Sequence, residues 1–246
     1  MKTSVAAGAA VLVLATVGAA NAADMPVKAP RIAPGAPVSS WTGFYIGING
    51  GGAWGRKCWT LTGTVPTIVG LPLPGNEGCH NTDGGIFGGQ IGYNWQSGAL
   101  VFGLEAQGNW ARLDGRNVSL LPSPPFPAST NHTRVDGLAL FTGRLGYASG
   151  PALFYAKGGA AAVWDKYDFV LTGTVVPAGV GSETRWGGTI GGGIEYKFTQ
   201  NWSGAVEYNY LAMGTSSITL DSQPVNALVD VRQHLHLLTA RINYSF

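Results

Sequence analysis

Apolar and polar side chains alternate along much of the chain. In the closing segment HLLTARINYSF, apolar side chains occupy every second position back from Phe246, and most positions between them are polar. This is the period of a β-strand with one apolar and one polar face. Similar alternation recurs in eight segments, each long enough to cross a membrane as a tilted strand. The segments are 41–54, 84–96, 99–112, 134–149, 151–164, 184–198, 201–213 and 231–246.

The connections between these segments alternate between short and long. The short ones consist of turn-forming residues, as in QSG, SGP and TQN. The long ones are rich in Pro, Ser, Thr and Asn and cover 55–83, 113–133, 165–183 and 214–230. Short turns on one side and long loops on the other are typical of outer-membrane barrels, so the pattern predicts that both chain termini lie in the periplasm.

Aromatic side chains concentrate at the ends of the segments. Amphipathic rings prefer the headgroup level of a membrane, so two aromatic girdles would explain this placement, whereas a soluble β-sandwich offers no reason for it. We therefore predict an all-β fold, an eight-stranded antiparallel transmembrane up-and-down β-barrel. The girdle residues are Trp95, Tyr147, Phe198, Trp202, Tyr244 and Phe246 at the short turns and Trp54, Trp110, Trp164 and Trp186 at the long loops.

The composition agrees with a membrane location. Charged residues make up 11% of the chain, against about 25% in ordinary soluble domains. The net charge is +2 and no basic cluster is present, which argues against nucleic acid as a partner.

The first residues resemble a targeting segment. Lys2 precedes the apolar run VAAGAAVLVLATVGAA, and Ala20-Asn21-Ala22 matches a signal-peptidase site. The alternative, a membrane anchor, fits less well because the run is short and rich in Ala and Gly. We expect a cleaved signal peptide at 1–22, a Pro/Ala-rich periplasmic leader at 23–40 and the barrel at 41–246.

The opening strand WTGFYIGINGGGAWG and the closing ARINYSF resemble the small outer-membrane β-barrel family of Gram-negative bacteria. This family includes the OmpA-type transmembrane domain and the surface-antigen, porin-like barrels of alphaproteobacteria. The resemblance implies a structural, surface-antigen or adhesion role, with external loops that meet an unidentified ligand. It also implies contact with outer-membrane lipid and a C-terminal signal at Tyr244 and Phe246 that the barrel-assembly machinery reads. The sequence does not fix the oligomeric state, and we favour a monomer.

Six charged residues lie on the polar faces of the alternating segments, which would face the interior of the barrel. An eight-stranded barrel has an interior that side chains just fill, and a buried charge must be paired. The charges therefore predict a salt-bridged plug; in the alternative, they line the ion path of a small passive porin. The six are Glu105, Glu195 and Glu207 against Arg144, Lys157 and Arg241.

The two cysteines, Cys58 and Cys79, both lie in the first predicted long loop. An even number of cysteines in an exported protein favours a disulfide, which would staple this loop. A metal site would need more ligands than the adjacent His80 supplies, so we expect neither a metal nor a cofactor.

A lipid-modifying enzyme is the least favoured interpretation. His234 and His236 share one face near the outer rim, and Ser216 or Ser217 is the best available nucleophile for His236. No third residue orients such a pair. We therefore expect two rim histidines that contact lipid headgroups, and no enzymatic activity.

Overall fold

The computed structural model describes residues 40–67, 69–70, 73–120, 129–171, 177–221 and 226–246. The expected signal peptide at 1–22 lies outside these residues, as does the expected leader at 23–40 apart from Ser40.

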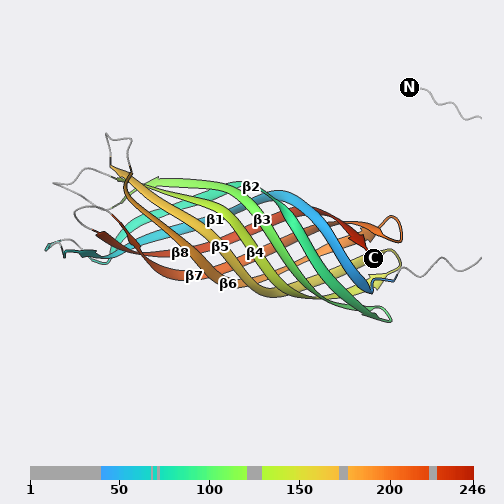
Figure 1. Ribbon diagram of the computed structural model, residues 1–246. Coiled ribbons are helices and arrows are strands. Elements are labelled where there is room, and N and C mark those ends of the chain that lie inside the picture. The colour runs from blue at the N-terminus through green and yellow to red at the C-terminus, as the bar shows by residue number, and fades with distance from the viewer. Residues whose placement is uncertain (1–39, 68, 71–72, 121–128, 172–176, 222–225) are drawn as a thin grey trace, which may run out of the picture. The chain divides into compact units, whose positions relative to one another are not determined.

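Eight antiparallel strands form one closed barrel, in which each strand pairs with its neighbours in sequence and β8 pairs with β1 (Figure 1). The predicted fold is therefore confirmed. Closure satisfies the backbone N–H and C=O groups that an open sheet edge would leave without partners in lipid. The strands are β1 (Gly43–Val65), β2 (Gly75–Ser97), β3 (Leu100–Val118), β4 (Ser129–Ser149), β5 (Ala152–Leu171), β6 (Pro177–Lys197), β7 (Trp202–Leu220) and β8 (Asn226–Ser245).

The four predicted long loops are shorter in the structure than the sequence indicated. The connections at that end of the barrel, called here the loop end, cover only 66–74, 119–128, 172–176 and 221–225, because the strands continue through most of the predicted loops. Register shifts in this half, for example between Val135 and Gly137, exchange the inward and outward parities. A β-bulge adds one residue to one strand, so a fixed period of two breaks there and the sequence reads as irregular.

The outer wall carries an apolar belt. Phe44, Ile46 and Ile48 of β1 are each more than half exposed, and they alternate with the buried Tyr45 and Asn49. Beyond Trp54 the outward positions of β1 become polar. The belt therefore ends at the loop-end girdle, and the strands continue past it. No helix among the described residues is long and apolar enough to cross a membrane.

Candidate functional site in the barrel lumen

The side chains in the lumen form alternating polar and apolar layers. Along β8, the buried inward residues include Arg241, then Leu237, then Gln233, then Val229. The first apolar cluster takes residues from every strand except β6, and the second takes residues from β1, β5, β7 and β8, so four layers follow one another from the turn end to the loop end. We call them the charged layer, the first apolar layer, the second polar layer and the second apolar layer.

A ring of four alternating charges lies in the charged layer. Lys157 Nζ lies 2.9 Å from Glu105 Oε1 and 2.7 Å from Glu207 Oε1. The Arg241 guanidinium forms ion pairs with the same two carboxylates, through Nη2 to Glu105 and Nη1 to Glu207. Each cation is thus shared by two anions, and each anion by two cations. All four side chains are almost completely buried, so strong pairing offsets the cost of removing them from water.

A second ion pair joins this ring through two tyrosines. Arg144 Nη1 lies 3.1 Å from Glu195 Oε2, and its guanidinium lies 4.9 Å and 5.0 Å from the ring centres of Tyr45 and Tyr155. The two phenols donate hydrogen bonds of 2.7 Å to the two carboxylates of the four-charge ring. The tyrosines therefore fix the arginine between them and also fill carboxylate lone pairs.

A chain of amides continues the network toward the first apolar layer. Asn243 Nδ2 donates to Glu195 at 2.8 Å, and Gln90 Nε2 donates to Asn243 Oδ1 at 2.7 Å. Asn49 Nδ2 donates to Gln90 Oε1 at 2.7 Å, and Asn49 Oδ1 accepts from Asn109 Nδ2 at 2.5 Å. Such connected hydrogen bonds specify one arrangement of the lumen rather than a fluid polar interior.

The structure thus brings all six predicted lumen residues into one layer, in which three carboxylates balance three cations. The sequence analysis did not assign Tyr45 or Tyr155 to this network. Parity could have found both residues, because Tyr45 alternates with exposed apolar neighbours and Tyr155 shares the parity of Lys157.

The first apolar layer was not expected from the sequence. It consists of Ala53, Ile86, Leu113, Val135, Leu138, Leu140, Ala161, Val163, Leu211, Met213, Leu235 and Leu237, all buried. Leu138 and Leu140 share the inward parity of Arg144, so the pattern already contained a signal. An apolar constriction of this kind excludes ions by excluding their hydration water.

The second polar layer lies past the loop-end girdle. Lys57 Nζ lies 2.7 Å from Asp165 Oδ1, and the Tyr167 hydroxyl donates to Asp165 Oδ2 at 3.1 Å. Burial is the largest influence on Lys57 and lowers the pKa of its ammonium to about 8, although Asp165 opposes this shift. Arg185 donates to the carbonyls of Gly214 and Val231 at 3.0 Å and 2.9 Å. The sequence analysis missed this layer because it placed Lys57 and Asp165 in loops.

Cys58 and Cys79 form a disulfide in the structure, with Cα atoms 4.0 Å apart. They are directly opposite each other in the β1–β2 ladder, so the bridge links two strands and does not staple an irregular loop. The neighbouring His80 points into the lumen, where its ring nitrogens contact Asn117 Oδ1 at 2.7 Å and Thr133 Oγ1 at 3.2 Å. No cluster of potential metal ligands occurs within the described ranges.

We expect acid to loosen the loop-end part of β2 through His80. Burial lowers the pKa of His80 below its ordinary value of 6.5. Below about pH 6.5 the unfolded segment gains a proton more readily than the folded one, so the local stability falls as the pH falls. Amide hydrogen exchange in residues 75–83 should show lower protection factors at about pH 5 than at about pH 7. The variant His80→Gln should show a smaller difference, and an unchanged difference would contradict this assignment.

The structure does not assemble the His–Ser pair that the disfavoured enzyme interpretation would need. His236 lies on the outer wall, where its ring stacks on Trp54 with centres 5.7 Å apart and its Nδ1 lies 2.6 Å from the Tyr208 hydroxyl. Ser216 donates instead to Glu183, and Ser217 to Asp230. Both serine hydroxyls therefore donate hydrogen bonds to carboxylates and not to His236. The His236 ring belongs to an aromatic cluster at the girdle.

Comparisons with known proteins agree with this geometry. A family model described as outer membrane protein beta-barrel domain matches residues 9–240. The 31 kDa outer-membrane immunogenic protein of Brucella melitensis biotype 1 is 30% identical over 237 residues, which cover 92% of this chain and 93% of that protein. The 22 kDa outer membrane protein of Rhizobium leguminosarum bv. viciae is 29% identical over 192 residues, covering 77% and 72% of the two chains.

A solved structure shares the architecture. The outer membrane protease OmpT from Escherichia coli superposes with a TM-score of 0.53 at 9% identity, covering 83% of this chain and 97% of that chain. Identity this low shows a common fold alone.

Proposed function

The chain belongs to the outer membrane protein β-barrel domain family and is an outer-membrane protein, and from this premise we propose that it is a closed structural barrel that presents a surface antigen. In this proposal both termini face the periplasm and the loop end faces the environment. The printed names of the Brucella relatives as outer-membrane immunogenic proteins support the surface-antigen role.

The layered lumen is the observation that carries this proposal. An ion that entered from the turn end would meet a fully paired ring of buried charges and then the first apolar layer. To pass the ring, the ion must break ion pairs. To pass the first apolar layer, it must lose its hydration water. Two unlike barriers in series support a plug and disfavour a passive channel.

An enzymatic role has less support. The Brucella and Rhizobium relatives are named as immunogenic or outer membrane proteins, and the protease name belongs to a protein that shares the fold alone. The separation of His236 from Ser216 and Ser217 removes the best pair for a lipid-modifying reaction.

The partners in this proposal are outer-membrane lipid, an unidentified external ligand at the loop end, and the barrel-assembly machinery, with the barrel itself a monomer. The barrel-assembly machinery would recognise Tyr244 and Phe246. Phe246 is 75% exposed, and its ring packs edge-on against Tyr244 at 5.1 Å, which in turn packs against Trp202 at 5.1 Å. This exposed aromatic cluster is accessible to a receptor from outside the barrel.

A planar-bilayer recording tests the proposed function. We expect refolded protein to give no conductance steps in samples where a heat-dependent gel shift shows that the barrel has folded. Reproducible steps from folded wild-type protein would overturn the plug and make the small passive porin the better description.

A further inference from the structure

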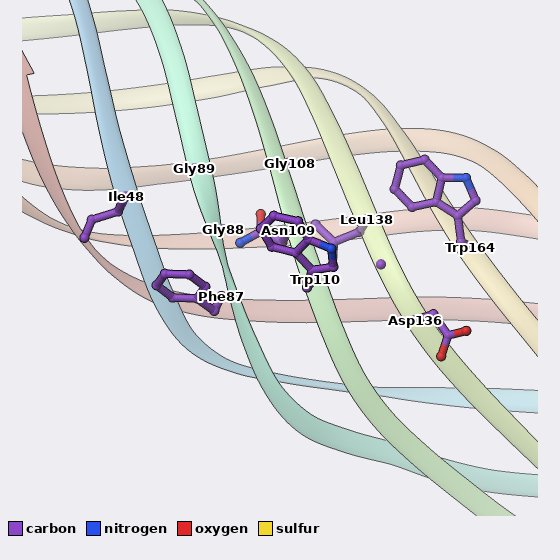
Figure 2. Close-up of a pocket in the computed structure, with 11 residues that line it drawn as sticks. Ile48, Phe87, Gly88, Gly89, Gly108, Asn109, Trp110, Asp136, Leu138 and Trp164 are labelled. Atoms are coloured by element: carbon purple, nitrogen blue, oxygen red, sulfur yellow. The ribbon is translucent and has the colours of Figure 1, made fainter.

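A groove on the outer wall crosses the loop-end girdle (Figure 2). Trp110 of β3 and Trp164 of β5 both pair with Gly137 of β4, so the two indoles flank a position without a side chain. Gly108 and Gly89 continue this gap down the wall toward the apolar belt. The result is a groove of about 680 Å³ whose lining includes three aromatic rings and four glycines.

A bulge places one acid at this groove. The inward parity of Leu138 and Leu140 would point Asp136 into the lumen, but the β3–β4 and β4–β5 ladders both shift register here. Asp136 is turned to the outer wall instead and lines the groove, as Figure 2 shows. Bulges commonly re-aim a side chain in this way beside functional sites.

Two cations are held beside the same acid. Arg134 Nε lies 2.8 Å and Lys166 Nζ 2.5 Å from the carboxylate oxygens of Asp136. Both cations are at least half exposed, and each has N–H donors in addition to the one that contacts Asp136. Arg134, Lys166 and Asp136 together carry one net positive charge, beside a groove lined mainly by aromatic, aliphatic and glycine residues.

We propose that this groove is a binding site for one acyl chain of a membrane lipid whose phosphate headgroup carries a net negative charge. The wall faces lipid because the chain is an outer-membrane barrel. The Trp164 indole lies over Gly137, but Gly108, where an added Cβ would meet no atom within 4 Å, leaves room for a chain beside the aromatic rings. Arg134 and Lys166 then donate hydrogen bonds to the phosphate at the headgroup level, and Asp136 holds both cations in place. Cationic side chains beside a membrane attract anionic headgroups in this manner.

Native mass spectrometry of the folded protein in detergent micelles tests the groove. The probes are the anionic phosphatidylglycerol and phosphatidylcholine, whose choline ammonium neutralises its phosphate, with identical acyl chains. Gly108→Leu places a side chain in the groove, and the added Cβ meets no atom within 4 Å. The matched control is Gly188→Leu on β6, which also faces outward and whose nearest atom would be Gly159 O at 4.0 Å. We expect the wild type and the control to retain phosphatidylglycerol and Gly108→Leu to lose it.

Lys166→Gln tests the headgroup contact without altering the groove. It should weaken phosphatidylglycerol retention about fivefold and leave phosphatidylcholine retention unchanged. This variant also decides the question if Gly108→Leu does not fold, because Lys166 is exposed. Equal retention of phosphatidylglycerol by the wild type and Gly108→Leu would overturn the proposal. So would equal retention of the two lipids by the wild type, or a dimer that Gly108→Leu dissociates, which would place a second copy of the chain on the groove.

Discussion

Replacing Arg241 by leucine is expected to lower the free energy of unfolding by about 3–5 kcal/mol. Arg241 forms ion pairs with Glu105 and Glu207, and the variant leaves Lys157 as the one cation of the ring. Two buried carboxylates would then share one ammonium. The excess negative charge must take up a proton or draw in water, and both responses destabilise the folded barrel.

Equilibrium unfolding by urea in detergent micelles measures this loss. Arg232→Leu is the matched control, since Arg232 lies on the same strand but is exposed on the outer wall, where we expect a change within about 1 kcal/mol. The double variant Arg241→Leu with Glu207→Gln removes one charge of each sign and should recover part of the loss. If Arg241→Leu costs no more than Arg232→Leu, the ring is hydrated and the plug interpretation fails.

The belt of the barrel could be predicted well from the sequence because lipid imposes a strict rule there. Every outward position between the girdles must be apolar or small, so inward residues such as Glu105 and Arg144 stand out by parity alone. The same parity brought the six charges together, although it could not tell which carboxylate each cation meets. That choice depends on the stagger between strands far apart in sequence, for example β3 and β8, which contribute Glu105 and Arg241.

The loop-end half could not be predicted in the same way, for two physical reasons. Past Trp54 and Trp164 the outward positions become polar, so the contrast between the two faces of a strand weakens. The interior there contains tightly packed apolar residues such as Trp59, which reverses the polarity expected of a lumen. Bulges near Gly137 and Gly214 then break the period itself. Lys57 and Asp165 were therefore assigned to loops although they form a buried ion pair.

The two inner layers are expected to block conduction independently, so a current should require that both be opened. The double variant Leu138→Ser, Leu237→Ser replaces two side chains of the first apolar layer by smaller, polar ones. It leaves the four-charge ring intact. Glu207→Ser with Arg241→Ser removes one charge of each sign from the ring and leaves the apolar layer intact. We expect both double variants to be silent in planar bilayers, since one complete barrier remains in each.

The variant that combines all four substitutions should conduct, because water can then reach across both layers. A heat-dependent gel shift for each variant separates a silent barrel from an unfolded one. If the variant with the two leucine substitutions conducts alone, the paired charges pass ions and the barrier lies in the apolar layer. If the variant with all four substitutions is folded and silent, the second polar and second apolar layers also close the lumen, and a third pair of substitutions at Trp59 and Val231 should be needed to open it.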